Sequence, residues 1–185
     1  HLMLRPGHER VKALGGLHRM MSWSSNILTD SGGYQVFNLA NRRKISDDGV
    51  VFRSHIDGTR YDLTPEGAIH IQQSLGSDIM MPLDVCAPHP CDEREVVDAM
   101  NRTTAWAKRS LEARTQGALF AIVQGGMHEQ LRAAHAGSLS ELPVDGYSIG
   151  GLSVGEPTEL LYQMCGYTAD LLPQDQPRYL MGVGT

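Results

Sequence analysis

The chain has 185 residues, of which 41% are hydrophobic and 20% are charged, a balance typical of a globular domain with a substantial core. No apolar run approaches the roughly 18 residues that a membrane-spanning helix needs, so no membrane association is expected. The formal net charge of −5 argues against a phosphate-binding surface that covers the whole chain, although short basic runs occur at residues 42–44 and 108–109.

The ends of the chain and its cysteines indicate its context. There is no basic and apolar leader, and the three cysteines are too few and odd in number for a disulfide framework, so a cytoplasmic protein is expected. The chain starts at His1 without an initiator methionine and stops at Thr185 directly after an apolar run. We therefore expect a piece of a longer protein.

The first third of the chain predicts a helix, a buried strand and an antiparallel insertion. Residues 7–22 have helical apolar spacing, weakened in the middle by Gly15 and Gly16. A strand near 26–30 ends abruptly in a carboxylate, a hydroxyl and two glycines. Residues 35–63 contain short β-like runs separated by Asp-Gly dipeptides, which are typical of tight hairpin turns.

From residue 64 onward, helices and strands alternate. Thr64 and Pro65 predict the start of a helix that Gly76 ends, and further helices are expected near 93–114, 128–141 and 157–171. Strands are expected at 78–83, 118–123, 146–149 and 178–181. Continuous apolar strands of this kind belong to parallel sheets that are buried on both faces.

Two α/β architectures compete, an open doubly wound sheet and a (β/α)8 TIM barrel. The open sheet usually has a glycine-rich phosphate-binding turn after its first strand, and no such pattern is present. Instead, every predicted strand ends in a polar residue or a glycine: Asp30, Asp84, Gln124, Gly150–Gly151 and Gly182. In a barrel these ends share the face that carries the active site, so we predict an incomplete TIM barrel with about five of its eight strands.

Two carboxylates, one amide and several backbone N–H groups would then surround one pocket. This set complements the edge of guanine, which donates from N1 and N2 and accepts at O6, while Tyr34 and Met181 can cover the faces of a planar base. Two other interpretations remain open from the residues alone. Paired carboxylates also serve glycoside cleavage, and Asp84 can instead form a structural ion pair with an arginine.

Five motifs in order resemble the tRNA-guanine transglycosylase (queuine tRNA-ribosyltransferase) family, with the likeness running from His1 to Thr185. They are TDSGGYQV at 29–36, GSDI at 76–79, FAIVQG at 120–125, GGLSVGE at 150–156 and PRYLMGVG at 177–184. The resemblance implies a glycosyltransferase that exchanges guanine at the wobble position of a tRNA anticodon for a 7-deazaguanine in queuosine biosynthesis. It implies double displacement on a TIM barrel, with residues 1–185 as one partial catalytic domain.

The resemblance also implies roles for individual residues. Asp30 would be the general acid/base, and Tyr34 and Met181 would sandwich the base. The substrate-binding set would be Asp30, Ser31, Gly32, Gly33, Tyr34, Asp84, Gln124, Gly150, Gly151, Leu152 and Met181. The tRNA-contacting region would begin with Gly182, Val183 and Gly184. Val154, with Cys86, resembles the bacterial form, which takes the small base preQ1.

Other family features are expected outside this chain. The aspartate nucleophile and a zinc-binding subdomain with three cysteines and one histidine would lie beyond Thr185, so the chain alone is expected to be inactive and to bind no metal. Cys86, His89 and Cys91 lack a C-x-x-C pair, and the eight histidines show no ligand spacing. Expected partners are the tRNA anticodon loop, guanine or preQ1, and a second copy when full length.

Two alternative functions remain. The chain can belong to a non-catalytic relative that binds tRNA or a catalytic partner. It can also belong to a barrel hydrolase that acts on nucleosides or glycosides.

Overall fold

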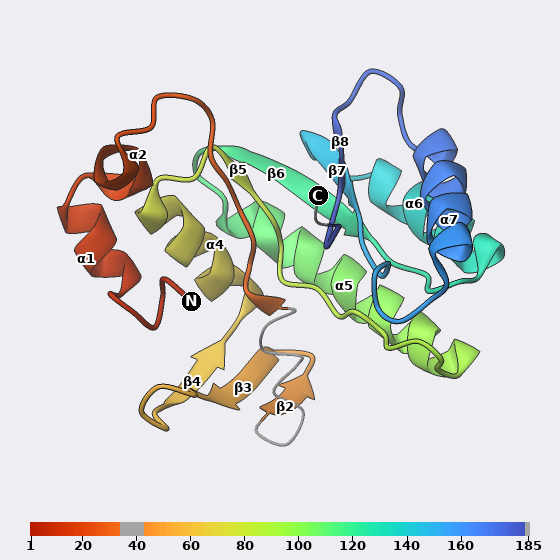
Figure 1. Ribbon diagram of the computed structural model, residues 1–185, viewed down its shortest axis with the longest axis horizontal. Coiled ribbons are helices and arrows are strands. Elements are labelled where there is room, and N and C mark those ends of the chain that lie inside the picture. Colours follow the sequence, from red (N-terminus) through yellow and green to blue (C-terminus); the bar gives the residue numbers. More distant parts are fainter. Residues whose placement is uncertain (34–42, 184–185) are drawn as a thin grey trace. The chain divides into compact units, whose positions relative to one another are not determined.

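The computed structural model describes residues 1–33 and 43–183 (Figure 1). In chain order the elements are α1 (His8–Ala13), α2 (Gly16–Met21), β1 (Leu28–Thr29), β2 (Arg43–Ser46), β3 (Gly49–Arg53), β4 (Arg60–Leu63), α4 (Pro65–Leu75), β5 (Ile79–Met80), α5 (Glu93–Ala113), β6 (Ala118–Val123), α6 (Glu129–Ser140), β7 (Gly146–Ile149), α7 (Thr158–Leu171) and β8 (Arg178–Leu180). The predicted alternation of strands and helices after residue 64 is confirmed.

The main sheet has the strand order β1-β5-β6-β7-β8, and each neighbouring pair is parallel. Helices α4, α5, α6 and α7 each lie between consecutive strands of this order. A doubly wound sheet reverses its strand order at a switch point, and this order never reverses. The sequential order is that of a barrel, so the fold is an incomplete (β/α)8 barrel.

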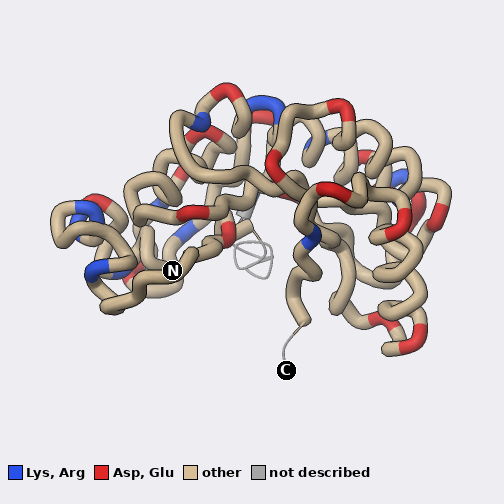
Figure 2. The backbone as a smooth tube through the Cα atoms, turned by 90° about the horizontal axis from the view of Figure 1, so that it is seen from above, with Lys and Arg blue, Asp and Glu red and all other residues tan. Residues whose placement is uncertain are grey.

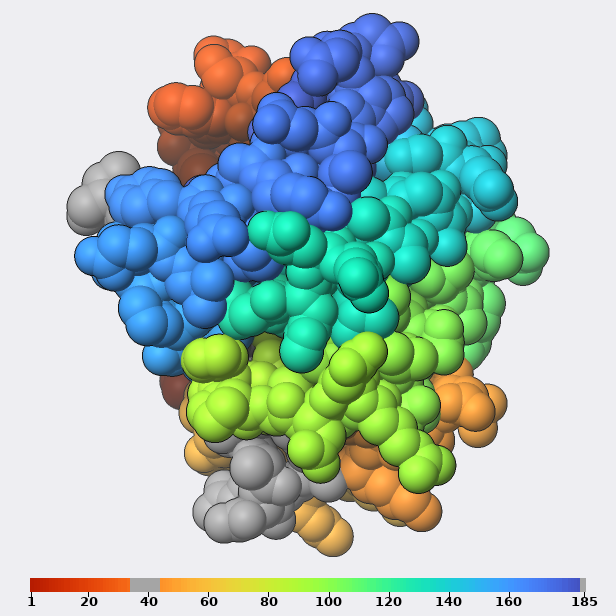
Figure 3. Space-filling model, turned by 90° about the vertical axis from the view of Figure 1, so that its right-hand side faces the viewer, coloured from red at the N-terminus to blue at the C-terminus, as the bar shows by residue number. Residues whose placement is uncertain are grey.

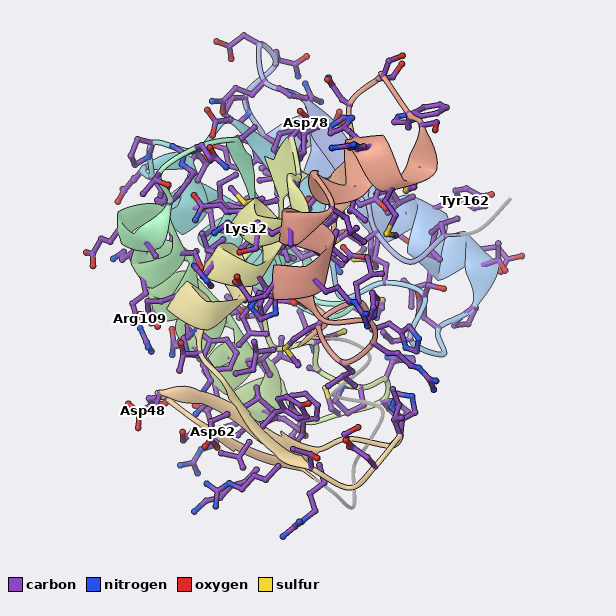
Figure 4. All side chains as sticks on the ribbon, turned by 90° about the vertical axis from the view of Figure 1, so that its left-hand side faces the viewer. Lys12, Asp48, Asp62, Asp78, Arg109 and Tyr162 are labelled. Atoms are coloured by element: carbon purple, nitrogen blue, oxygen red, sulfur yellow. The ribbon has the colours of Figure 1, made fainter. Side chains whose placement is uncertain are left out.

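A separate antiparallel sheet, β2-β3-β4, forms the predicted insertion. The first part of the predicted insertion, residues 35–42, lies outside the described residues. Arg109 in α5 fastens the β2–β3 turn: its guanidinium donates to the carbonyls of Asp47 (2.9 Å) and Asp48 (3.3 Å) and to both oxygens of Glu66 (2.6 and 2.8 Å). Figure 4 labels Arg109 and Asp48.

The prediction of one helix over residues 7–22 is wrong. Gly15 adopts a left-handed conformation with φ of 93°, which an α-helix cannot contain, so the segment divides into α1 and α2. Both short helices pack through a common cluster of buried side chains that also includes one residue of α4. The cluster consists of Val11, Leu17, Ile27 and Leu75.

Helix α4 begins and ends as predicted. The Thr64 side chain accepts a hydrogen bond from the Gly67 N–H at 3.1 Å, Pro65 is the first helical residue, and Gly76 ends the helix with a left-handed φ of 78°. The strand predicted for residues 78–83 is shorter, because β5 pairs only over residues 79–80. Residue Met81 bonds to a side chain of α4 instead, as described below.

The chain divides into two compact units. Unit 1 comprises His1–Leu83 and Arg109–Leu119, and unit 2 comprises Asp84–Lys108 and Phe120–Thr185. Acidic positions outnumber basic ones, 21 to 16, along the sequence, and Figure 2 marks those in the described part of the chain. Within unit 2, Figure 3 shows α6 between α5 and α7 on one face.

In the described part of the chain, none of the helices is both long and apolar enough to cross a bilayer.

Candidate functional site

The end of β1 is held by a buried amide of α4. Gln72 is 1% exposed, and its Oε1 accepts from the Thr29 hydroxyl at 3.0 Å and from the Met81 N–H at 3.0 Å. Its Nε2 donates to the Met81 carbonyl at 2.8 Å. The side chain thus bonds to Met81 as a neighbouring strand would, which explains why β5 ends early and why Thr29, directly before Asp30, is fixed.

Asp30 follows β1 and lines a cavity of about 580 Å³ in unit 1. Its neighbours there include Ser31, Gly32, Phe52 and His55. Although the side chain reaches solvent, the surrounding protein desolvates the carboxyl and raises its pKa above the ordinary value. A raised pKa makes a carboxyl group a better proton donor and acceptor than an ordinary surface aspartate.

The residues after Asp30 form a tight turn. The Gly33 N–H donates to the Ser31 hydroxyl at 3.3 Å, and Gly32 has a φ of 84°, which favours glycine. Tyr34, the predicted aromatic cover of the base, lies outside the described residues.

Asp84 and Gln124 meet in the interior of unit 2. The Gln124 Nε2 donates to the Asp84 Oδ2 at 2.7 Å, and both side chains are buried. Asp84 lies in the segment after β5, and Gln124 directly follows β6. Because an amide NH2 has two hydrogens, Gln124 can hold Asp84 with one and offer the second to a carbonyl oxygen.

His135 of α6 holds the backbone of Gln124 in place through a hydrogen bond. The Gln124 backbone N–H donates to His135 Nδ1 at 2.8 Å, so the ring proton lies on Nε2, which bonds to the Thr104 hydroxyl at 3.0 Å. Burial lowers the pKa of His135 to about 4, with a smaller contribution from the nearby Arg132 cation. His135 is therefore a neutral acceptor that positions the backbone of Gln124.

Gly150 and Gly151 pack directly against Gln124. A Cβ on Gly150 would lie 2.6 Å from Ile122 Cγ2, and one on Gly151 would lie 2.5 Å from Gln124 Oε1. Gly151 also has a φ of 65°. Only glycine fits these two positions, and the backbone can approach a ligand closely there.

Arg132 of α6 joins the segments that follow β6 and β7. Its side chain is fully buried, and its guanidinium donates to the carbonyls of Gly126 (2.7 Å), Gly150 (3.1 Å) and Gly151 (3.2 Å) and to the Thr168 hydroxyl (3.3 Å). Burial lowers its pKa to about 10, which still leaves it a cation at neutral pH. Arg132 thus fixes the glycines beside Gln124.

The segment after Gly151 forms a turn that is held by hydrogen bonds between its own residues. The Glu156 carboxylate accepts from the backbone N–H groups of Ser153 and Val154, while Leu152 is buried. Nearby, burial and then the Asp84 charge raise the pKa of the Cys86 thiol to about 12. Cys86 therefore stays a thiol at neutral pH and is no nucleophile.

The last predicted site residues follow β8. The Met181 N–H donates to the Ile149 carbonyl at 3.1 Å, which continues the β7–β8 pairing by one residue, and the Met181 side chain is half-buried. Gly182 and Val183 are exposed, and Gly184 lies outside the described residues. Unit 2 thus brings Asp84, Gln124, Gly150 and Gly151 together, and Asp30 has its own surroundings in unit 1.

Three supporting residues escaped the sequence reasoning: Gln72, Arg132 and His135. Each lies inside a helix that reads as amphipathic, where a single polar residue is usually a solvated one. One sequence signal for Arg132 is its place at the end of the first turn of α6, directly before Ala133 and Ala134 and shortly after Gly125 and Gly126.

Among the described residues, one group of His, Cys, Asp and Glu is close enough to share a metal ion: His8, Glu9 and His70. In this described part of the chain, Cys86, His89 and Cys91 do not form a second group of this kind.

Comparison with known proteins gives a consistent result over the whole chain. A protein-family model described as "Queuine tRNA-ribosyltransferase" matches residues 1–185. Curated proteins of that name are similar to the full length of this chain: those of Ruminiclostridium cellulolyticum and Pelotomaculum thermopropionicum are each 54% identical, and that of Caldanaerobacter subterraneus subsp. tengcongensis is 55% identical. The chain covers 50% of the length of each, so it spans about half of the curated relatives that it matches.

Proposed function

We propose a function from one premise: this chain belongs to the queuine tRNA-ribosyltransferase family. The natural protein that carries it exchanges guanine in a tRNA anticodon for a 7-deazaguanine. The observation that carries this proposal is the buried Asp84–Gln124 pair beside the two glycines of 150–151.

The pair has the donors and acceptors that the edge of guanine requires. A carboxylate such as that of Asp84 can accept from the N1 and N2 donors of guanine, and the second hydrogen of the Gln124 amide can donate to O6. The backbone N–H of Gly151, beside the Gln124 side chain, can add a further polar contact. Together with Gly150, Leu152 and Met181, these residues would line the base pocket within unit 2.

Asp30 is the general acid/base of the exchange. A carboxylate nucleophile from outside this chain attacks C1′ of the ribose, the C1′–N9 bond breaks, and the protonated Asp30 gives its proton to the departing guanine, which leaves Asp30 as a carboxylate. The incoming base then gives its N9 proton to Asp30 and displaces the carboxylate from C1′, which restores the enzyme. The raised pKa of Asp30 supports this role.

The remaining features follow from the family. Residues 1–185 are part of one catalytic domain, the tRNA contacts begin at 182–184, and zinc is held by ligands outside this chain. The protein acts in the cytoplasm as a homodimer, with preQ1 as its incoming base because Val154 narrows the pocket.

Incorporation of labelled guanine into tRNA by the natural protein tests the proposal. Asp30→Asn should lower the exchange rate about 100-fold or more while tRNA binding is kept. Asp170→Asn, the same change at an exposed position of α7, is the matched control and should leave exchange unchanged. Exchange that survives the Asp30 change rejects its role, and turnover of a free nucleoside without tRNA binding supports a hydrolase instead.

A further inference from the structure

Three metal-ligating side chains meet on the outer surface of α1 and α4, in unit 1. Glu9 Oε1 lies 3.5 Å from His8 Nε2 and 3.6 Å from His70 Nε2, and one donor atom of each residue lies within 4.8 Å of the others. The two imidazole rings are 5.9 Å apart and nearly perpendicular. Figure 4 looks onto this side of α1 and α4, with Lys12 marking α1.

These separations fit a shared cation better than hydrogen bonds. Nitrogen–oxygen hydrogen bonds in proteins are about 2.7–3.2 Å long, and both Glu9 distances are longer. In a tetrahedral zinc site with bonds of about 2.0–2.1 Å, neighbouring ligand atoms are about 3.4 Å apart. The carboxylate oxygen therefore already lies near the ligand-to-ligand distance from both imidazoles.

The ligand set selects the kind of metal. Two imidazoles and one carboxylate suit zinc and its neighbours in the first transition series, whereas calcium and magnesium prefer oxygen ligands throughout. The backbone beneath the ligands is held in place, because the buried Val11 of α1 and Leu75 of α4 pack in one cluster. The two helices therefore present the three side chains on one surface.

We propose that His8, Glu9 and His70 bind a divalent transition-metal ion, with zinc as the best match, and that water completes a tetrahedron. The ion links α1 to α4, the helix whose Gln72 holds the end of β1. Spacing in the sequence gives no sign of this group, because 61 positions separate Glu9 from His70 and only the fold brings them together. This inference does not depend on the base-exchange reaction.

Metal titration of the natural protein, stripped with a chelator, tests the site. We expect the protein to bind one zinc or cobalt(II) ion per chain more than His70→Ala binds, or to bind that ion about tenfold or more tightly. Cobalt(II) should give the visible absorption of a tetrahedral site. His128→Ala, a change at an exposed histidine in unit 2, is the matched control and should bind as the unchanged protein does.

Glu9→Gln keeps the shape of the surface and removes only the charged ligand, so it tests the site even where a histidine variant fails to fold. Paramagnetic broadening by cobalt(II) of the amide signals of α1 and α4 provides a second measurement that a metal elsewhere would not produce. Equal stoichiometry and affinity in the unchanged protein, His70→Ala and Glu9→Gln would overturn the proposal. Broadening confined to residues outside α1 and α4 would overturn it as well.

Discussion

In unit 1 the end of β1 and the segment after β5 are held by the neutral amide of Gln72, whereas in unit 2 the segments after β6 and β7 are held by the cation of Arg132. Both side chains are buried, and both bond to backbone groups. Gln72 belongs to α4, which lies between β1 and β5 of the main sheet in the sequence, and Arg132 belongs to α6, which lies between β6 and β7. A neutral amide enters the interior at a small desolvation cost. A guanidinium must be met by several carbonyls, and Arg132 meets three of them.

In the histidines the charge is distributed the other way: the environment favours a charged side chain in unit 1 and a neutral one in unit 2. His18 in unit 1 is half-exposed, and both of its ring nitrogens face acceptors, the Trp23 carbonyl and the Asp78 carboxylate, each at 2.8 Å. Hydrogen bonds to these two acceptors raise the pKa of His18 and so favour its cationic form. His135 in unit 2 is buried and accepts from a backbone N–H, so it is held neutral. Partners and burial together, and not residue type, set the charge of each group.

Removal of the buried cation should have the largest effect. Arg132→Met keeps much of the volume but leaves the carbonyls of Gly126, Gly150 and Gly151 without these donors, so we expect a loss of about 3–5 kcal/mol in the free energy of unfolding. Denaturant unfolding of the natural protein measures it. Arg10→Met, at an exposed position of α1, should change stability by less than about 0.5 kcal/mol. Equal effects of the two changes on stability would contradict the proposed role of Arg132 in holding the three carbonyls.

Removal of the buried amide should cost less. Gln72→Met leaves the Met81 N–H and carbonyl and the Thr29 hydroxyl without this partner, at an expected cost of about 2–4 kcal/mol. Relative to the unchanged protein, the amide hydrogen-exchange rate of Gln72→Met should increase most at Met81. Gln130→Met, on the exposed side of α6, is the control. An unchanged exchange rate at Met81 would show that the Gln72 side chain does not protect the Met81 amide in the way a neighbouring strand would.

Acid should weaken unit 2 through His135. Its pKa is about 4 when folded and about 6.5 when unfolded, so below pH 6.5 the unfolded chain binds the proton first and the folded state loses stability as the pH falls. The loss from this group should reach about 2 kcal/mol at pH 5. His135→Asn keeps an acceptor near the Gln124 N–H without titrating, and its unfolding energy should vary less between pH 7 and 5. An unchanged pH dependence would assign the loss to other groups.

Alkali should weaken unit 1 through His18, with the smallest effect of the four because the ring faces water. Bonds to the Trp23 carbonyl and then to Asp78 raise the pKa of His18 above 6.5. Its contribution is therefore full below pH 6.5 and is lost as the pH rises through the raised folded pKa. Hydrogen exchange at the Ile27 amide, which donates to Asp78, should report it. His18→Gln should remove this pH dependence, and a dependence that persists would contradict the assignment.

Local signals predicted much of the fold. The start of α4 at Thr64–Pro65 and its end at Gly76 could be predicted because helix caps depend on neighbouring residues. Strands β6 and β7 could be predicted because buried parallel strands need continuous apolar runs. The single helix over residues 7–22 was wrong because the left-handed Gly15 outweighs its apolar spacing. Five motifs sufficed for the family, which the comparisons confirm.

The sequence by itself determined the strand-and-helix alternation, the family and the polar strand ends, because these are properties of short segments and of their order. Only the tertiary structure decided which groups meet: the Gln72 amide at Met81, the Arg132 guanidinium at Gly126, Gly150 and Gly151, and Glu9 between two histidines. The physical reason is that burial and long-range partners set the charge and bonding of a side chain, and neither is encoded in its immediate neighbours.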